Sequence, residues 1–260
     1  MSVKLTILGS GSAGNASYVE TDETRILVDA GFSARQIRLR LASIGRAPEN
    51  LTAILITHEH SDHTAGLVGI AEKLNIPVYC NRSTMDEIKR SLGATLDFRL
   101  FVSGGSFDVG DISVETFSVP HDAQDPVGFM LRTSNGNIGI ATDLGHVTRL
   151  VGERTRAANV LVLESNHDVR MLQECPHRSW GLKQRILSRH GHLSNEAAAD
   201  CAADIMSANL RHLYLGHLSS DCNKPELAFK VMQHRLQQIG ATHVQLNLTS
   251  QATPCPTLTL

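Results

Sequence analysis

The sequence predicts an α/β protein folded as a four-layer αβ/βα sandwich, with two central sheets and helices on their outer faces. Two observations indicate this fold class. The chain contains two successive blocks of short apolar β runs, and each block ends in helical segments. In addition, no linker, repeat or low-complexity stretch divides the 260 residues, so we expect one domain over residues 1–260.

The first block begins with apolar and β-branched runs that are typical of strands. Strands are expected over residues 3–8, 17–20, 25–29, 53–57 and 77–80. Helices are expected over residues 34–44, 63–74 and 82–92. In the first of these helices, Ile37, Leu41 and Ile44 recur at helical spacing and would form one buried face.

The second block starts with short β runs between residues 98 and 142, separated by Gly and Asn. Residues 112–117 and 138–141 are the clearest of these runs. Strands and helices then alternate along the chain. We expect strands over residues 159–164, 212–215 and 243–248, and helices over residues 179–189, 194–208 and 224–238.

The composition is that of an ordinary α/β enzyme, with 42% hydrophobic residues and a net charge of -2. This charge gives no general attraction to nucleic acid, so binding of a polyanion requires a local basic patch. The N-terminal segment is too short and strand-like for a signal peptide, and no apolar run approaches the roughly 20 residues of a membrane span. The five cysteines are scattered, as expected for reduced thiols. We therefore expect a cytoplasmic protein that does not enter a membrane.

The most informative segment is His58-Glu59-His60-Ser61-Asp62-His63, which directly follows the apolar run at residues 53–56. Neutral imidazole and carboxylate are good ligands for Zn, Mn or Fe, and no cysteine lies nearby to suggest a closed structural zinc site. A polar, solvated loop is the alternative. The 13 histidines of the chain, a high count for its length, favour metal chemistry.

Three later residues follow apolar runs in the same way. His121 comes after Val119-Pro120, Asp143 after residues 140–142, and His217 after residues 213–216. A single histidine at the end of a strand is more often structural than functional. Together with the first segment, however, these residues form four clusters at strand ends. A site for two metal ions needs more ligands than the four in the first segment, and these three residues would supply them.

The order His-x-His-x-Asp-His, followed by these residues, resembles the signature of the metallo-β-lactamase superfamily. The resemblance implies the metallo-β-lactamase fold and two divalent cations, Zn or Mn, with Fe as a further possibility. One cation would be bound by His58, His60, His121 and Asp143, and the other by Asp62, His63, Asp143 and His217. Asp62 is also a candidate catalytic residue. Asp29 would support the ligand loop, although a carboxylate that caps a surface turn is nearly as compatible with the sequence.

The segment from Gly9 to Asn15 contains G-x-G-x-x-G after a strand, as in dinucleotide-binding folds. That fold requires a helix directly afterwards, and two further strands are expected here instead. The dinucleotide interpretation therefore fails. The loop could still bind a phosphate through Ser12 and Asn15, and a plain turn fits equally well.

Residues 175–195 carry local positive charge and no acidic side chain. The basic residues are Arg178, Lys183, Arg185 and Arg189, and Trp180 lies among them. Positive charge beside an aromatic ring is what a nucleic-acid strand requires from a nearly neutral protein. A solvated helix face is the alternative interpretation.

The segment from Gly191 to Asn195 resembles the glycine-histidine-serine segment of the ribonuclease Z branch. By this resemblance His192 would protonate the leaving oxygen and Glu164 would orient it. Asn166, His167 and Ser194 are further candidate substrate contacts, with Ser194 or the residue after it as a helix N-cap.

At a finer level, five segments resemble the small single-domain WalJ/YycJ-type subgroup of the superfamily. They are Gly9–Asn15, His121–Ala123, Ala141–Gly145, Glu164–Asp168 and Gly191–Asn195. The resemblance implies a bacterial cytoplasmic phosphodiesterase that digests nucleic acid, DNA above all, in the 5′→3′ direction and is linked to DNA repair. Its nucleophile would be a metal-bridging hydroxide. Hydrolysis of a thioester or a lactam at the same site is the main alternative, and a non-hydrolytic metal-bound sensor is a third.

Overall fold

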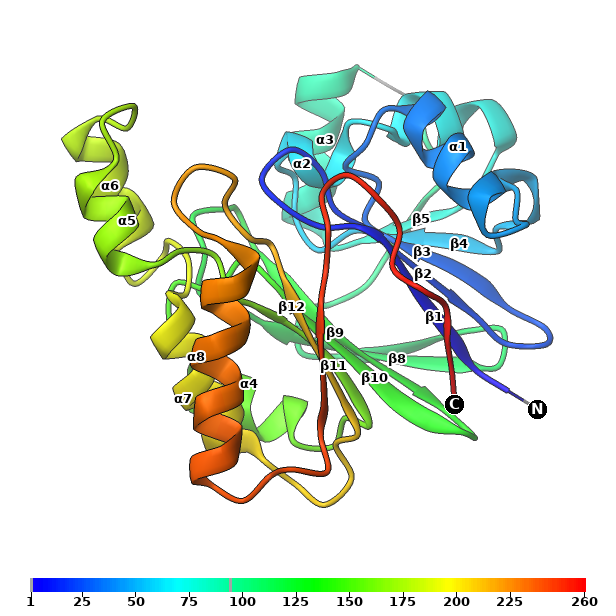
Figure 1. Cartoon of the computed structure of the whole chain (residues 1–260). Helices are drawn as coiled ribbons and strands as arrows, with labels where there is room; N and C mark the ends of the chain where they lie inside the picture. The colour runs from blue at the N-terminus through cyan, green and yellow to red at the C-terminus, as the bar shows by residue number, and fades with distance from the viewer. Residues whose placement is uncertain (1, 94) are drawn as a thin grey trace.

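The computed structural model describes residues 2–93 and 95–260 and contains two seven-stranded sheets that pack face to face (Figure 1). The first sheet consists of β1 (Lys4–Gly9), β2 (Ala16–Glu20), β3 (Arg25–Val28), β4 (Ala53–Leu55), β5 (Val78–Cys80), β6 (Phe98–Leu100) and β14 (Leu258–Thr259). Its strand order is β14-β1-β2-β3-β4-β5-β6. The strands from β3 to β6 run parallel, and the remaining pairs are antiparallel.

The second sheet has the same plan. It consists of β7 (Ser106–Val109), β8 (Ile112–Ser118), β9 (Val127–Thr133), β10 (Gly136–Ala141), β11 (Val160–Glu164), β12 (His212–Gly216) and β13 (Gln245–Leu248). Its strand order is β13-β12-β11-β10-β9-β8-β7. The strands from β10 to β13 run parallel, so both sheets combine an antiparallel half with a parallel half.

Helices cover the outer face of each sheet (Figure 1). The first sheet is covered by α1 (Ala34–Ser43), α2 (Ser61–Thr64), the π-helical segment η2 (Val68–Glu72) and α3 (Arg82–Leu92), with a short 3-10 turn at Pro48–Asn50. The second sheet is covered by α4 (Arg149–Thr155), α7 (Asn195–Ile205) and α8 (Pro225–Gln238). Two short helices, α5 (Val169–Glu174) and α6 (Trp180–Ile186), stand apart from both sheets in Figure 1. None of the described helices is long and apolar enough to cross a bilayer.

Three apolar layers hold the sandwich together, and the alternation of side chains along each strand creates them. In β11, Val160 and Val162 face the cluster between the sheets, while Leu161 and Leu163 face the cluster beneath the helices. The outer face of the first sheet has a cluster of its own against α1 and α3, which includes Ile37 and Leu41. Both sheets are therefore buried on both faces, and the predicted four-layer αβ/βα sandwich is confirmed.

The helix expected over residues 63–74 is instead interrupted. α2 ends at Thr64, and η2 continues as a π-helical segment. The interrupted stretch packs closely against α1. A Cβ at Gly66 would lie 2.5 Å from Ile37 Cδ1, and one at Gly69 would lie 2.4 Å from Ala34 Cβ. Both glycines permit contacts that a regular helix with larger residues would prevent.

Candidate metal centre

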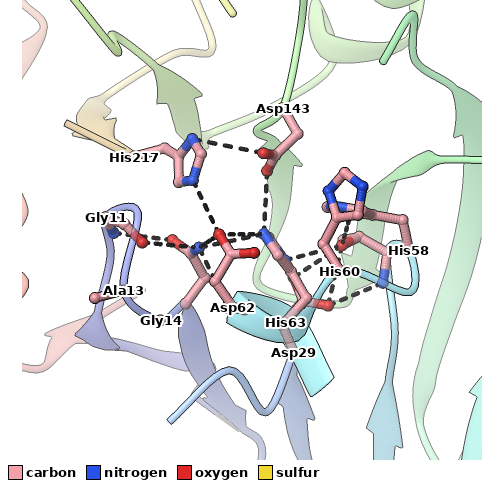
Figure 2. Close-up of polar contacts among 12 residues, drawn as sticks. Gly11, Ala13, Gly14, Asp29, His58, His60, Asp62, His63, Asp143 and His217 are labelled. Carbon is pink, nitrogen blue, oxygen red and sulfur yellow. Dashed lines mark hydrogen bonds and ion pairs between the residues drawn. The ribbon is translucent and has the colours of Figure 1, made fainter. Parts of the chain in front are cut away.

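The ends of four strands meet at one end of the sandwich and bring the predicted ligands together (Figure 2). His58, His60, Asp62 and His63 follow β4, and His121 follows β8. Asp143 follows β10, and His217 follows β12. Within each of three overlapping groups, the candidate ligand atoms lie within 4.8 Å of one another. These groups are His58 with His60 and His121, His58 with His63 and Asp143, and Asp62 with His63 and His217.

The first group consists of imidazoles whose inner nitrogens face one another. His58 Nε2 lies 3.0 Å from His60 Nδ1. The outer nitrogens are engaged elsewhere, because His121 Nδ1 donates to the carbonyl of Gly191 at 3.1 Å and His58 Nδ1 lies 3.0 Å from Thr57 Oγ1. Such outer contacts fix the tautomer and orientation of a metal-binding imidazole.

The second group surrounds Asp62. Asp62 Oδ2 lies 3.4 Å from His217 Nε2 and 3.5 Å from His63 Nε2. Both imidazoles are buried, while Asp62 is half-buried. A carboxylate beside two imidazoles is a usual donor set for a divalent cation.

Asp143 lies between the two groups. Its Oδ1 is 3.6 Å from His121 Nε2, and its Oδ2 is 3.3 Å from His63 Nε2. Oδ2 is buried and finds no hydrogen-bond partner among the described residues. Buried carboxylate oxygens are nearly always satisfied, so the unpartnered oxygen fits a bound cation.

A second carboxylate, Asp29, lies directly behind the ligand loop. Asp29 Oδ2 accepts a hydrogen bond from His63 Nδ1 at 2.8 Å. Its Oδ1 accepts from the backbone N–H of Thr57 at 2.9 Å and from the Thr57 hydroxyl at 3.0 Å. Asp29 therefore orients His63 and anchors the start of the loop, as expected from the sequence.

Glu164 has the same position behind His217, and this contact was not predicted. Glu164 Oε1 lies 2.8 Å from His217 Nδ1 and 2.7 Å from His192 Nδ1. Its Oε2 accepts the backbone N–H groups of Leu144 at 2.8 Å and Leu193 at 3.0 Å. Only the strand order could have indicated this contact. β11 pairs with β12 so that Glu164 lies opposite Gly216, the residue before His217.

The backbone around the site adopts unusual conformations. Asp29, Asp143 and His217 have φ angles of 61°, 60° and 54°, in the left-handed region that non-glycine residues rarely occupy. Gly31 supports the site in another way, because a Cβ there would lie 1.6 Å from the carbonyl oxygen of Asp62. Such strain typically concentrates at functional sites, where the surrounding structure enforces it.

The buried carboxylates and imidazoles of the site shift the pKa values of its histidines in different directions. Burial alone would lower the pKa of His63 and of His217, but the surrounding carboxylates, Asp29 for His63 and Asp143 for both, raise each pKa well above its ordinary value. Burial and the neighbouring imidazoles hold the pKa of His58 well below its ordinary value. The buried carboxylates therefore favour positive charge within the cluster, and a divalent cation supplies it when protons leave the ligands.

A cavity of about 190 Å³ opens above these residues. Its walls include the candidate ligands His60, Asp62, Asp143 and His217. His192 and Arg178 also line it. The candidate ligands are thus accessible to a small group from one side. An open side is typical of a catalytic rather than a structural metal site.

Residues 24–218 match the family model described as "Beta-lactamase superfamily domain". The chain belongs to the metallo-β-lactamase superfamily. Similarity to solved structures agrees at the level of the fold. The metallo-β-lactamase fold protein YhfI from Bacillus subtilis has a TM-score of 0.73 at 15% identity, covering 98% of this chain and 99% of YhfI. Zinc-bound PqqB from Methylobacterium extorquens has a TM-score of 0.70 at 16% identity, covering 97% and 99%.

Within the superfamily, the chain belongs with the YycJ and WalJ proteins, which confirms the predicted subgroup. It is 39% identical to "Exodeoxyribonuclease YycJ" of Bacillus anthracis over 242 residues, covering 92% of this chain and 91% of the relative. It is 40% identical to "Exodeoxyribonuclease WalJ" of Streptococcus pneumoniae over 239 residues, covering 90% and 88%.

Not all of the predicted substrate contacts reach the cavity of this metallo-β-lactamase-fold protein. Ser12, Asn166 and Arg178 line it. Asn15, His167, Lys183 and Ser194 are not among its lining residues, so their assignment as substrate contacts stays a prediction.

The structure shows where each of these four side chains lies instead. Asn15 holds its own loop, accepting from Ser10 Oγ at 2.9 Å, and its Nδ2 lies 3.4 Å from Asp62 Oδ2. His167 is only 1% exposed. Lys183 Nζ donates to the carbonyl of Gln173 at 2.7 Å, and Ser194 caps α7 by accepting from Ala197 N–H.

Part of the basic segment lies in an arm, consisting of α5, α6 and the residues between them, which stands apart from the sheets in Figure 1. Arg178 and Arg185 line the cavity, whereas Trp180 is 70% exposed. Acidic residues from other elements pair with the arginines. Arg185 forms an ion pair with Asp122, and Arg178 lies 3.2 Å from Asp221. The sequence correctly located the positive charge but did not indicate these acidic partners.

Proposed function

We propose that this protein is a metal-dependent exodeoxyribonuclease that hydrolyses phosphodiester bonds with two divalent cations. The observation that carries the proposal is the position of Asp143, whose unpartnered oxygen lies between two groups of candidate ligands beneath an open cavity. The printed names of the YycJ and WalJ relatives support DNA as the substrate.

We infer that Asp143 would be a ligand in both sites. The other ligands of the first site would be His58, His60 and His121, and those of the second would be Asp62, His63 and His217. Imidazole and carboxylate donors suit Zn and Mn, and they also accept Fe. When bound, such a pair of cations supplies Lewis acidity to the phosphoryl oxygens. It also lowers the pKa of a bound water molecule to about 7.

His192 is the proton donor in this proposal. Its Nδ1 donates to Glu164 at 2.7 Å, which leaves Nε2 for the leaving oxygen of the substrate. Burial alone would lower the pKa of His192, but the charge and hydrogen bond of Glu164 raise it above its ordinary value. A raised pKa favours the protonated ring, which is the form that a general acid requires.

In this proposal, arginine side chains of the arm bind the nucleic acid. Arg178 and Arg185 border the cavity, where they can contact phosphates on either side of the bond that is cleaved. Arginine binds phosphate through a planar fork of donors, and it retains its charge at all relevant pH values. A lactam or thioester has no such row of negative charges, so these arginines favour a polynucleotide. We further propose 5′→3′ digestion.

The test is a panel of substrates assayed with Zn or Mn. It contains 5′-labelled single- and double-stranded DNA, the same sequences as RNA, a chromogenic cephalosporin lactam and a glutathione thioester. We expect DNA to be degraded stepwise from the 5′ end, with an Asp143→Asn variant as the inactive control. Turnover of the lactam or thioester with intact DNA would refute the proposal.

A further inference from the structure

A second and larger cavity adjoins the cavity above the candidate metal ligands. Its volume is about 630 Å³, compared with about 190 Å³ for the first. It is lined by Arg178 and by residues from three stretches of the chain, 10–13, 218–225 and 248–251. The first and last of these stretches lie side by side in Figure 1, and the N–H of Ser10 donates to the carbonyl of Ser250 at 3.1 Å.

The two cavities share part of their walls. Ser12, Arg178 and Ser219 line both of them. Arg178 is 20% exposed and lies 3.5 Å from Ser219 Oγ, so its guanidinium forms part of the partition. A chain that places one phosphate at the metal centre can therefore reach the second cavity with the adjoining unit.

The walls of the second cavity differ in chemistry from those of the first. Among the described residues that line it, Arg178 and Asp221 are the only charged ones, and they pair with each other at 3.2 Å. The rest of the lining is uncharged. It combines apolar side chains such as Leu218 and Leu248 with hydroxyl and amide groups such as Ser220 and Gln251. A neutral, partly apolar wall is unsuited to a phosphate and suits a flat heterocycle with a sugar.

We propose that this cavity binds the nucleoside next to the phosphodiester that is cleaved. This assignment rests on the proposed function and names the part of the substrate that the metal centre does not hold. Sites of about 300–1,000 Å³ commonly enclose a single small organic molecule, and the cavity falls within that range. Hydroxyl groups both donate and accept hydrogen bonds, so the cavity accepts each base with little preference.

Two variants that fill the cavity from opposite walls test the proposal. Ala13→Trp adds bulk on the loop that Figure 2 shows beside Gly11 and Gly14, and Ser220→Trp adds it from the loop after β12. Both positions are exposed, so folding tolerates the larger side chain. Ala252→Trp is the matched control, because Ala252 is exposed in the neighbouring C-terminal loop and is not among the lining residues.

The substrates are two activated phosphodiesters that differ in one group. One is the nitrophenyl ester of thymidine 5′-monophosphate, and the other is methyl nitrophenyl phosphate, which has no nucleoside. We expect the wild-type protein and Ala252→Trp to favour the thymidine ester in kcat/KM by about tenfold or more, since a filled pocket discriminates on that scale. Ala13→Trp and Ser220→Trp should remove this preference through KM and leave the methyl ester unchanged.

Inhibition provides a readout that does not depend on the reacting bond. Thymidine 5′-monophosphate should inhibit the wild-type protein more strongly than inorganic phosphate does, and both filled variants should abolish the difference. Equal hydrolysis of the two esters by the wild-type protein, a preference retained in both filled variants, or equal loss on both esters would overturn the inference. Inactivity of the wild-type protein on every phosphodiester would instead refute the proposed function.

Discussion

Glu164 Oε1 lies 2.7 Å from His192 Nδ1, and the same oxygen also lies 2.8 Å from His217 Nδ1. One buried carboxylate thus orients both the candidate proton donor and a candidate metal ligand. Its other oxygen is held by the backbone N–H groups of Leu144 and Leu193, so the carboxylate has a single fixed orientation. We therefore expect a change at Glu164 to affect metal binding and proton donation together, and a change at His192 to affect proton donation alone.

His192→Ala should separate substrates by their leaving group. Cleavage of DNA needs a proton on the departing alkoxide, and general acids contribute about 10²–10⁴ in rate. A nitrophenolate leaves without that proton. The variant should therefore lose about this factor on DNA, retain most activity on a nitrophenyl phosphodiester and bind as much metal as the wild type. Equal loss on both substrates, or loss of metal, would make His192 a ligand or a structural residue.

Glu164→Gln should weaken metal binding as well as DNA cleavage. Loss of a carboxylate behind a metal-binding imidazole typically lowers metal affinity by about 10–100-fold. Sequence reasoning alone predicts only a milder form of the His192→Ala effect, because it assigns Glu164 to His192 and not to His217. Competition with a coloured chelator measures the affinity. An unchanged affinity would show that the contact with His217 has no energetic role.

Asp143→Ala removes the shared carboxylate and should disrupt both candidate sites. Elemental analysis should find two divalent cations per wild-type chain and clearly fewer in the variant. Removal of metal from the wild type by a chelator should abolish hydrolysis, and added Zn or Mn should restore it. At most one cation in the wild type, together with wild-type behaviour of Asp143→Ala, would sink the assignment of a dinuclear site.

Replacing Arg178 and Arg185 together by alanine should weaken DNA binding and make it less dependent on salt. The slope of log affinity against log salt concentration falls by about 0.9 for each lost phosphate contact on duplex DNA. Lys183→Ala is the matched control, because Lys183 binds the carbonyl of Gln173 and does not line the cavity. Hydrolysis of methyl nitrophenyl phosphate should change little in all of these variants. A larger effect of Lys183→Ala would place the nucleic acid on the other face of the arm.

Glu20 should make stability depend on pH in the acidic range, far from the metal centre. Hydrogen bonds from Arg46 outweigh burial and lower the pKa of Glu20 to about 2. Because the pKa is lower in the folded state, the stabilisation is complete above the unfolded value of 4.5 and is lost as the pH falls toward 2. Urea unfolding of the metal-free protein at pH 7, 5 and 3 should show a smaller acid-induced loss for Glu20→Gln. The exposed neighbour Glu23, changed to Gln, should leave the pH profile unaltered.

Strand ends explain why the candidate ligands could be predicted from the sequence. Each group of candidate ligands follows an apolar run, and parallel strands such as β10 and β12 end at the same edge of a sheet. Local pattern therefore determined both the type of residue and its place. The same holds for Asp29, which follows β3.

Other features depend on tertiary contacts that local pattern does not reveal. β14 has only two residues and exists because it pairs with β1, more than 200 positions away in the chain. α4 and α5, of seven and six residues, are too short to show an apolar period. The basic composition of the arm was evident, but the helix face that turns Arg185 toward the cavity and Lys183 away from it was not.

The left-handed backbone at Asp29, Asp143 and His217 sets stability against activity at the same three positions. Glycine adopts such angles without a steric penalty, whereas a residue with a Cβ loses roughly 1–2 kcal/mol there. A descendant of this protein that no longer needed metal could therefore become more stable by acquiring glycine at any of them. Glycine at one of these strand ends would also remove a side chain that forms or orients the candidate metal centre, so relief of the strain and loss of the site would come together.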